Sequence, residues 1–449
     1  MAYWVTRTQR PVGQGGFHTA SVEFSRNEQE PSWTVGGDGA IFNPFRYVYD
    51  CGEFGSSRSN IDLAVTAYGN EINGADLDVL FISHAHADHT NAVGELHAAI
   101  TSGGGKIKTI ILPLLDPFNR LITFAQSANS EDAAVQGLAL EILIHPRAAL
   151  SPLADDVIFV VGDDEVPDDF DPVDPDDSDD AVPTSSDDLD ALVERLPFQL
   201  VGAFPVTRGR NVTLTHAVDI IVKNPYRSAT YDGDDWLLKT FIDPDVFGQK
   251  SAFIGELKKR LRAKNPSADH LVNNLNAAAM RELLTRHAVD VTSAYTTAIR
   301  PKDANVTSMS LYSGPKHHSL RGDGRLRIGR TIIPSGSAKG WLLTGDACLS
   351  AQGRLEAFLG HFEVVKKSVA VFALPHHGSD HNFAEGMLGA WSPRALYTTN
   401  ASPPPKWRHP ATKVVNAVSS IGARMHVVTD KAPSTIVFTA GNAEAPPAS

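Results

Sequence analysis

The stretch FISHAHADHTNAVGEL, residues 81–96, places three histidines and an aspartate within six positions: His84, His86, Asp88 and His89. Every buried imidazole nitrogen needs a hydrogen-bond partner, so a protein core seldom accommodates histidines at this density. Imidazole and carboxylate groups are natural ligands of divalent metals. The cluster therefore predicts a metal site, and a polar loop with incidental histidines is the alternative.

The spacing within the cluster favours two ions. A tight loop after a strand would let His84 and His86 point to one metal, while Asp88 and His89 turn toward a second. A structural zinc site is closed by four ligands and usually includes cysteine. The chain has 2 cysteines, both outside the cluster. A catalytic centre with open coordination positions is therefore favoured.

The stretch SHAHADH resembles the HxHxDH signature of metallo-β-lactamase-fold hydrolases. Further motifs follow in the order that this superfamily has: YDCG with Asp50, WLLTGDA with Asp346, and LPHHGSDHN with His376 and His377. The later motifs, together with ANVTSMSLYS (304–313) and TNASPPPKWRHP, are similar to the hydrolase domain of the competence protein ComEC and its soluble relatives. The resemblance covers residues 11–112 and 304–439.

The chain departs from that pattern in two ways. ComEC-type domains often carry Asp where this sequence has His86, and they are fused to membrane helices of which this sequence shows none. We therefore do not carry over the DNA-uptake role of ComEC. What the resemblance does imply is an α/β fold, the αββα metallo-β-lactamase sandwich, and a bridging role for Asp346, for which a turn aspartate is the alternative. It also implies that Asp50 orients a loop or histidine around the site.

The later histidines are assigned by position. Adjacent side chains rarely aim at one point, so we expect His377 to bind metal and His376 to lie nearby, facing the substrate. His409 precedes an expected helix, whose free N–H groups favour an anion; a surface-loop histidine is the alternative. The remaining histidines are open as a third ligand of the first metal, for example His97, His145, His216, His270 and His287.

These assignments define an expected mechanism. His84 and His86 hold the first ion, the second is held by Asp88, His89 and His377, and Asp346 bridges. A metal-bridging hydroxide attacks the substrate. Asp88, Asp346, His376 and His409 form the expected catalytic set, with either His376 or His409 binding a substrate oxygen or the leaving group. Histidine-rich ligation favours two zinc ions, and manganese is the second candidate.

Short apolar runs alternate with helix-like segments along both halves of the chain, which two sheets covered by helices would accommodate. The expected strands are 45–50, 78–83, 107–112, 217–222, 308–313, 341–345, 369–374, 395–399, 425–428 and 435–439. The expected helices are 91–100, 132–144, about 252–287, 351–361 and 410–421, the last with Pro410 in its first turn and Gly422 past its end. We expect residues 1–112 and 304–449 to form the two halves of the sandwich and 113–303 to be an insertion region.

The net charge of −12 comes from one segment. Residues 163–190 contain 14 Asp or Glu and no Lys or Arg, which leaves 52 − 14 = 38 acidic against 40 basic residues elsewhere, a balance of +2. This composition predicts a disordered insertion, and the near-neutral remainder does not exclude an anionic substrate. The sequence shows no signal peptide, membrane span or disulfide framework, so a cytoplasmic protein without membrane attachment is the simplest interpretation.

Three functions remain open. The leading one is a phosphodiesterase or nuclease, with nucleic acid or another phosphodiester as substrate; the basic stretch KKRLRAK (258–264) would be a contact or, more simply, a solvated helix face. The second is hydrolysis of a small ester, lactone, β-lactam or thioester, because the same metal core serves all of these. The third is a non-enzymatic, metal-stabilised protein that binds a partner.

Overall fold

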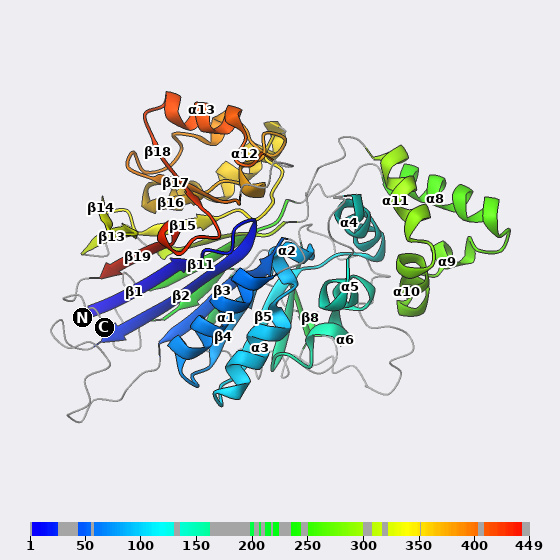
Figure 1. The fold of residues 1–449 in the computed structure, drawn as a ribbon, viewed down its shortest axis with the longest axis horizontal. Coiled ribbons are helices and arrows are strands. Elements are labelled where there is room, and N and C mark those ends of the chain that lie inside the picture. The colour runs from blue at the N-terminus through cyan, green and yellow to red at the C-terminus, as the bar shows by residue number, and fades with distance from the viewer. Residues whose placement is uncertain are drawn as a thin grey trace.

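The computed structural model describes residues 2–25, 44–54, 58–129, 135–161, 198–201, 206–207, 212–216, 219–223, 235–243, 250–299, 308–316, 322–350, 352–402 and 408–441. Two sheets face each other and helices cover their outer faces (Figure 1). The acidic segment 163–190, for which we predict disorder, lies outside the described residues.

The first sheet joins the amino-terminal strands to the carboxyl-terminal one. Its order is β14 (Thr331–Gly336), β13 (Asp323–Ile328), β19 (Ile436–Gly441), β1 (Ala2–Gln9), β2 (Gly15–Ser25), β3 (Phe45–Glu53), β4 (Leu77–Phe81), β5 (Ile107–Pro113), β6 (Asp156–Val161), β9 (Val212–His216) and β8 (Val206–Thr207). Strands β3, β4, β5, β6 and β9 run parallel, so their carboxyl ends reach the same edge.

The second sheet contains most of the carboxyl-terminal strands. Its order is β18 (Arg424–Val428), β17 (Leu396–Asn400), β16 (Val369–Ala373), β15 (Gly340–Leu343), β12 (Ser310–Pro315), β11 (Trp236–Phe241), β10 (Asp219–Val222) and β7 (Gln199–Val201). Strands β15 to β18 are parallel. The region 113–303 thus contributes strands to both sheets, although the division of the chain into domains stays a prediction.

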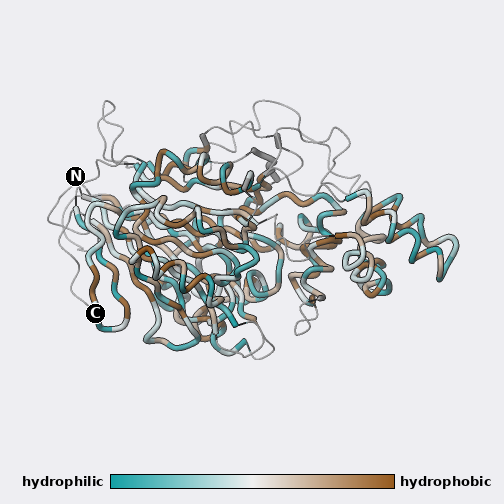
Figure 2. The backbone as a smooth tube through the Cα atoms, turned by 90° about the horizontal axis from the view of Figure 1, so that it is seen from above, coloured by the Kyte–Doolittle hydropathy of each residue, from teal (hydrophilic) through white to brown (hydrophobic). Residues whose placement is uncertain are grey.

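Alternating side chains build three apolar layers. On β4, Val79 and Phe81 face the other sheet, whereas Leu80 packs toward the helices, as expected of a strand buried on both faces. The first sheet is covered by helices that include α1 (Ser59–Ile72), α3 (Val93–Ser102), α4 (Pro117–Asn129), α5 (Gly137–Ile144) and α6 (Pro146–Leu150), and the second by α12 (Gln352–His361) and α13 (Thr412–Ser420). Hydrophobic stretches of the chain run through the interior (Figure 2). The expected αββα sandwich is confirmed.

Most expected strands form with shifts of a few residues, but two expected helices differ. The span 252–287 divides into α8 (Lys250–Lys264), α9 (His270–Asn273) and α10 (Ala277–Thr285), followed by α11 (Ala288–Ala298). Pro266 lies in the first break, where its ring would clash with a continuing helix. Helix α13 begins at Thr412, so Pro410 lies before the helix and not in its first turn as expected. The N–H of Ala411, between the two, donates to the carbonyl of Gly378. None of the described helices is long and apolar enough to cross a bilayer.

His361, at the end of α12, should make the fold acid-sensitive. Its ring packs between Phe241 and Phe362, at centroid distances of 5.1 and 4.9 Å. Burial, reinforced by Lys239, lowers the pKa of His361 to about 4. Because the folded pKa lies below the unfolded one, its contribution to stability is complete above pH 6.5 and is lost as pH falls toward 4.

We therefore expect His361→Phe to lose less stability than the parent protein between pH 7 and pH 4.5. The difference should reach roughly 2 kcal/mol, since one unit of pKa shift corresponds to about 1.4 kcal/mol and the ring is partly exposed. Urea unfolding of both proteins at the two pH values measures it. An identical loss in both proteins would show that His361 does not charge on unfolding.

Candidate metal centre

The site lies where strands from both sheets end. The carboxyl end of β4 leads through Ser83 into the cluster and into α2 (Ala87–Thr90), with His86 directly before that helix. On the second sheet, β15 leads through Gly345 to Asp346, and β16 leads to the short 3₁₀ turn His376–Gly378. The sandwich therefore brings motifs that are far apart in the sequence to one edge.

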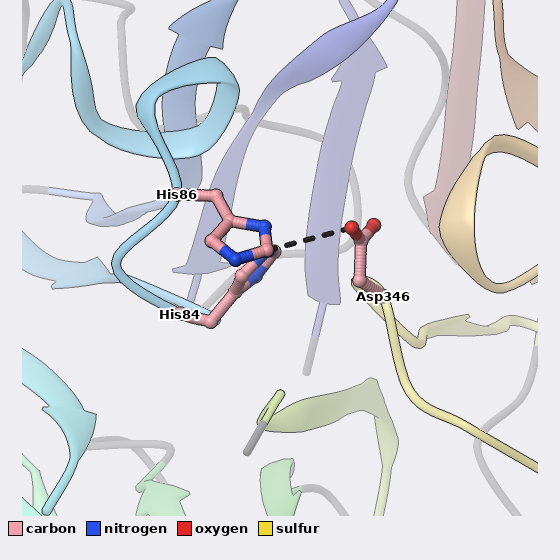
Figure 3. Close-up of side chains that lie close together, drawn as sticks. All are labelled: His84, His86 and Asp346. Atoms are coloured by element: carbon pink, nitrogen blue, oxygen red, sulfur yellow. Dashed lines mark ion pairs between the residues drawn. The ribbon is translucent and has the colours of Figure 1, made fainter. Parts of the chain in front are cut away.

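Two groups of side chains converge at this edge. His84, His86 and Asp346 form the first, and Asp88, His89 and His377 the second; within each group, one ligand atom of every residue lies within 4.8 Å of the others. Figure 3 shows the first group, with the two histidines on the loop after β4 and Asp346 facing them from the other sheet. These are the six residues that the sequence predicts as ligands.

Asp346 lies between the two groups. Its Oδ2 is 3.5 Å from His84 Nε2, and its Oδ1 is 3.5 Å from His89 Nε2 and 3.9 Å from His377 Nε2. Its backbone is fixed on both sides, since its N–H donates to Ser308 Oγ and its carbonyl accepts from Asn382 Nδ2. Each carboxylate oxygen thus faces a different group, which is the arrangement that a bridging ligand requires.

Hydrogen bonds fix the orientation of the rings. Asp50 accepts the hydroxyl of Ser83, at 2.8 Å, and Nδ1–H of His89, also at 2.8 Å. Because the Ser83 proton is directed to Asp50, Ser83 Oγ accepts Nδ1–H of His84 at 2.9 Å. His377 Nδ1–H donates to the backbone carbonyl of Asn400 at 2.9 Å. In the neutral rings, Nε2 then carries the lone pair and points into the site.

This geometry fits divalent metal. The Nε2 atoms of His84, His86 and His89 are buried and have no hydrogen-bond partner among the described residues, which is costly unless a cation binds there. His377 Nε2 lies 3.3 Å from Asp88 Oδ2. When the His377 ring is neutral, its Nε2 carries a lone pair, so two hydrogen-bond acceptors face each other. A proton or a metal ion would relieve this contact.

Electrostatics point the same way. Burial opposes charge on both Asp346 and His89. The nearby His376, His89 and His84 nevertheless hold the pKa of Asp346 well below its usual value. Burial also lowers the pKa of His89, but Asp50, Asp88 and Asp346 raise it well above the ordinary value. The site therefore attracts positive charge, and metal binding would displace the proton that the raised pKa favours on His89.

Glycines in two motifs permit the close approach of these loops. A Cβ on Gly52, in YDCG, would lie 2.5 Å from the carbonyl carbon of Asp88. Gly345, in TGD, has φ +50°, and a Cβ there would lie 2.9 Å from Ser83 Cβ. Asp50, His376 and His377 also have positive φ, at 60°, 47° and 54°, a conformation that is costly for residues other than glycine and that clusters at functional sites.

His376 and His409 lie at the rim of the metal centre. His376 Nε2 is 3.7 Å from Asp346 Oδ2, and its Nδ1 is 2.9 Å from Asn382 Oδ1. The His409 ring centroid lies 5.8 Å from that of His376. Burial and the neighbouring His377 and His376 lower the pKa of His409 to about 4, which keeps this ring neutral near pH 7. Both rings can therefore offer hydrogen bonds beside the metal ligands.

Among the described residues, no further histidine joins the first group. His145 accepts from Ala148 N, His270 contacts the Ser267 carbonyl, and His287 pairs with Asp290. Neither these nor His97 joins a cluster of potential ligands among the described residues, and the side chain of His216 lies outside them. The anchoring groups Ser83, Ser308, Asn382 and Asn400 are not identified as functional from sequence, although each lies in or beside a recognised motif.

We expect Asp50→Asn to weaken metal binding by about 10- to 100-fold, the usual cost of removing a partner that orients a ligand. The amide lacks one of the acceptors that Ser83 and His89 use. Calorimetric titration of metal-free protein with Zn²⁺ measures the effect. Glu53→Gln is the matched control on the same strand, because Glu53 is also buried but accepts from the backbone of Asn60 and Ile61. Equal Zn²⁺ affinities of the parent protein and Asp50→Asn would rule out an orienting role for Asp50.

Comparison with known proteins adds a family match. A sequence model described as the Metallo-beta-lactamase superfamily matches residues 37–187, which include the HAHADH cluster. No curated protein matches the chain. The crystal structure of a long form RNase Z from yeast is similar over 53% of this chain and 27% of that chain, with 14% identity and a TM-score of 0.21. The chain thus spans about a quarter of that protein, and a likeness at this level identifies no function.

Proposed function

We propose that this chain, whose residues 37–187 match the metallo-beta-lactamase superfamily, hydrolyses phosphodiesters with two divalent metal ions. The observation that carries the proposal is the position of Asp346, with one carboxylate oxygen toward each of two separate ligand groups. The superfamily match over residues 37–187 and the site geometry support a metal-dependent hydrolase. The phosphodiester specificity rests on the ComEC-like order of the later motifs, and nucleic acid strands are one candidate substrate.

The ligand roles follow from the two groups. His84, His86 and Asp346 would hold the first ion, and Asp88, His89 and His377 would hold the second, with Asp346 shared. When bound, such ions polarise a phosphoryl oxygen and lower the pKa of water toward neutrality. Zinc suits this donor set, and manganese is the second candidate.

The remaining side chains orient the expected ligands or would contact the substrate. Asp50 and Ser83 hold the ligand rings in the tautomer that turns Nε2 toward the metals. Neutral His409 would donate a hydrogen bond to a non-bridging oxygen or the leaving group, and the neighbouring His376 is the alternative contact for that group. The basic stretch 258–264 adds no support for nucleic acid, because Arg260, Arg262 and Lys264 pair with Glu256, Asp269 and Asp290.

The proposal is tested with zinc- and manganese-loaded protein and with metal-stripped protein as the control. Substrates are single-stranded DNA, a chromogenic phosphodiester and a panel of lactones. We expect metal-dependent cleavage of the phosphodiester. Hydrolysis of lactones alone would assign the protein to the hydrolases of small esters. An absence of turnover on every substrate by metal-loaded protein would favour a non-enzymatic role.

We further propose a cytoplasmic location, which the two free, buried cysteines suit. Cell fractionation would check this location.

A further inference from the structure

The side chain of Asn382 is fully buried and joins two parts of the candidate metal centre. Its Nδ2 donates to the carbonyl of Asp346 at 2.9 Å and lies 3.4 Å from that of Ala347. Carbonyl oxygens can only accept, so this end of the amide is the nitrogen and the other end is the oxygen. That oxygen, Oδ1, lies 2.9 Å from Nδ1 of His376. The contact is a hydrogen bond only when His376 Nδ1 carries a proton and donates it.

This bond fixes where the neutral His376 ring holds its proton. A neutral imidazole has one N–H, and its other nitrogen is an acceptor. Because Asn382 holds the proton on Nδ1, the lone pair is on Nε2. The backbone of His376 is also fixed, since its N–H donates to the carbonyl of Gly345 at 2.9 Å. The neutral ring therefore accepts a hydrogen bond through Nε2 and has no proton to donate there.

Nε2 of His376 lies next to the place where a substrate would react. It is 3.7 Å from Oδ2 of Asp346, the expected bridging ligand. The His376 side chain is 24% exposed, whereas that of Asp346 is 3% exposed, so a molecule that arrives from solvent can reach the ring. Among the described residues, His376 belongs to neither ligand group. Its lone pair is therefore available to a group on the substrate.

The position of this proton separates the roles of the two histidines at the rim. A phosphoryl oxygen accepts hydrogen bonds, and neutral His376 has none to give at Nε2. The donor to such an oxygen would then be His409, whose Nδ1 has no partner among the described residues. A hydroxyl group, in contrast, can donate to His376 Nε2.

We infer that Asn382 is a positioning residue, which holds His376 in the tautomer that accepts a hydrogen bond from a hydroxyl group of the substrate. The inference rests on the proposed function, since it places the reacting phosphorus at the metal centre. It narrows the substrate class to phosphodiesters that carry a hydroxyl group close to the scissile bond.

The ring ¹⁵N resonances of labelled histidine report the tautomer without any turnover. In the zinc-loaded full chain at about pH 8.5, where histidine in water is neutral, we expect His376 to carry its proton on Nδ1. The spectrum of His376→Phe identifies its resonances. Asn382→Ala removes the acceptor, so the ring should shift toward the Nε2–H form. Asn91→Ala is the matched control, because Asn91 also bridges the backbone, through two bonds to Glu53, and neither bond involves a histidine.

Calorimetry with 2-hydroxyethylphosphonate and ethylphosphonate, which differ by one hydroxyl group, tests the recognition. The zinc-loaded parent protein should bind the hydroxyl compound about fivefold more tightly, the usual worth of one neutral hydrogen bond. The preference should disappear in Asn382→Ala. It should also disappear in His376→Phe, which leaves the bond from Asn382 to the Asp346 carbonyl in place. Asn91→Ala should keep the preference.

The outcomes separate this inference from the proposed reaction. A proton on Nε2 of His376 in the parent protein, in the other neutral tautomer or in the cation, would overturn the positioning role of Asn382. Equal affinity for the two phosphonates, binding of neither, or a preference that persists in His376→Phe would overturn the recognition of a hydroxyl group, whether or not the protein hydrolyses phosphodiesters. Conversely, the expected tautomer and preference without any phosphodiester turnover would retain the inference and reject the proposed reaction.

Discussion

Asp346→Asn should lower kcat by at least about 10³-fold while the protein stays folded. The substitution removes the charge that both ligand groups share, and loss of even one group that stabilises developing charge typically costs 10²- to 10³-fold. The fold should survive, because the bonds that position this residue, from its N–H to Ser308 and from Asn382 to its carbonyl, are made by its backbone.

The measurement is kcat on a chromogenic phosphodiester at saturating metal, together with circular dichroism. Asp380→Asn is the matched control, since Asp380 is an exposed aspartate in the loop that follows the two histidines. It should retain parent activity. A kcat for Asp346→Asn within tenfold of the parent, with a normal spectrum, would rule out the bridging role and leave Asp346 as a buried turn residue.

Asp88→Ala should reduce the metal content from two ions per chain to one. Asp88 contributes a carboxylate only to the second group, where its Oδ2 lies 3.3 Å from His377 Nε2 and 3.8 Å from His89 Nε2. The first group keeps His84, His86 and Asp346, so its ion should remain. Removal of a direct ligand is expected to cost more than removal of an orienting partner, which is already worth about 10- to 100-fold in affinity.

Elemental analysis after dialysis against a low concentration of Zn²⁺ measures this content. Asp62→Ala, an exposed aspartate on α1, serves as the control and should keep both ions. Two ions in Asp88→Ala would refute the assignment of the second group. Loss of both ions would show that the groups do not bind metal independently.

The proximity of four of the six expected ligands was predictable from sequence because these four residues are local. His84, His86, Asp88 and His89 fall within six residues after an apolar run, so their proximity needs only one strand and one loop. The motif order then indicated Asp346 and His377. The structure brings all six together, while their role as ligands stays a prediction until metal is measured.

Strand β1 shows why sequence patterns can fail. Its inward positions are Tyr3, Val5 and Arg7, and the arginine interrupts the apolar alternation that would identify a strand. Arg7 is nonetheless fully buried, with its guanidinium 4.4 Å from the Phe438 ring centroid and one Nη donating to the carbonyl of Ser313 at 2.6 Å. These partners come from the far end of the chain, so no local pattern could show that the charge would be accommodated.

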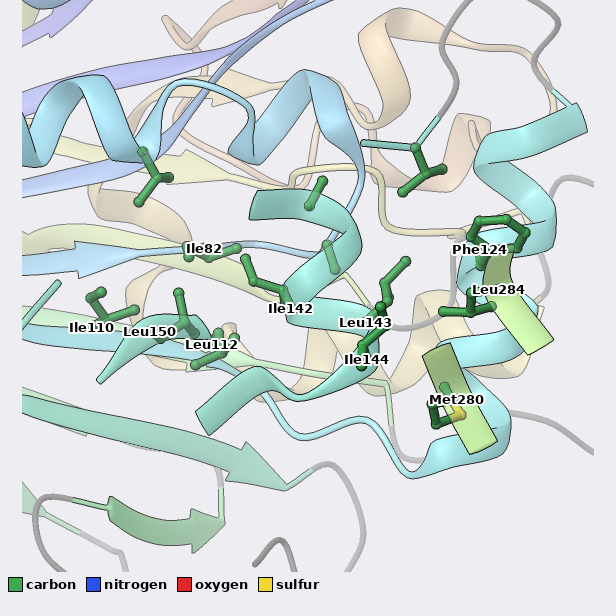
Figure 4. Close-up of a cluster of buried hydrophobic side chains, with 14 of the residues drawn as sticks. Ile82, Ile110, Leu112, Phe124, Ile142, Leu143, Ile144, Leu150, Met280 and Leu284 are labelled. Carbon is green, nitrogen blue, oxygen red and sulfur yellow. The ribbon is translucent and has the colours of Figure 1, made fainter. Parts of the chain in front are cut away.

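The sequence by itself determined the kinds of ligand, their order and the alternation of strands and helices, because these depend on neighbouring residues. Only the tertiary structure decided which ring nitrogen of His89 and His377 points into the site, since their Nδ1 partners are Asp50 and the carbonyl of Asn400, on other strands. It also decided that each oxygen of Asp346 faces a different group. Such contacts join residues that are distant in the chain, and they exist only when two sheets and their helices pack together, as a cluster of buried hydrophobic side chains does in Figure 4.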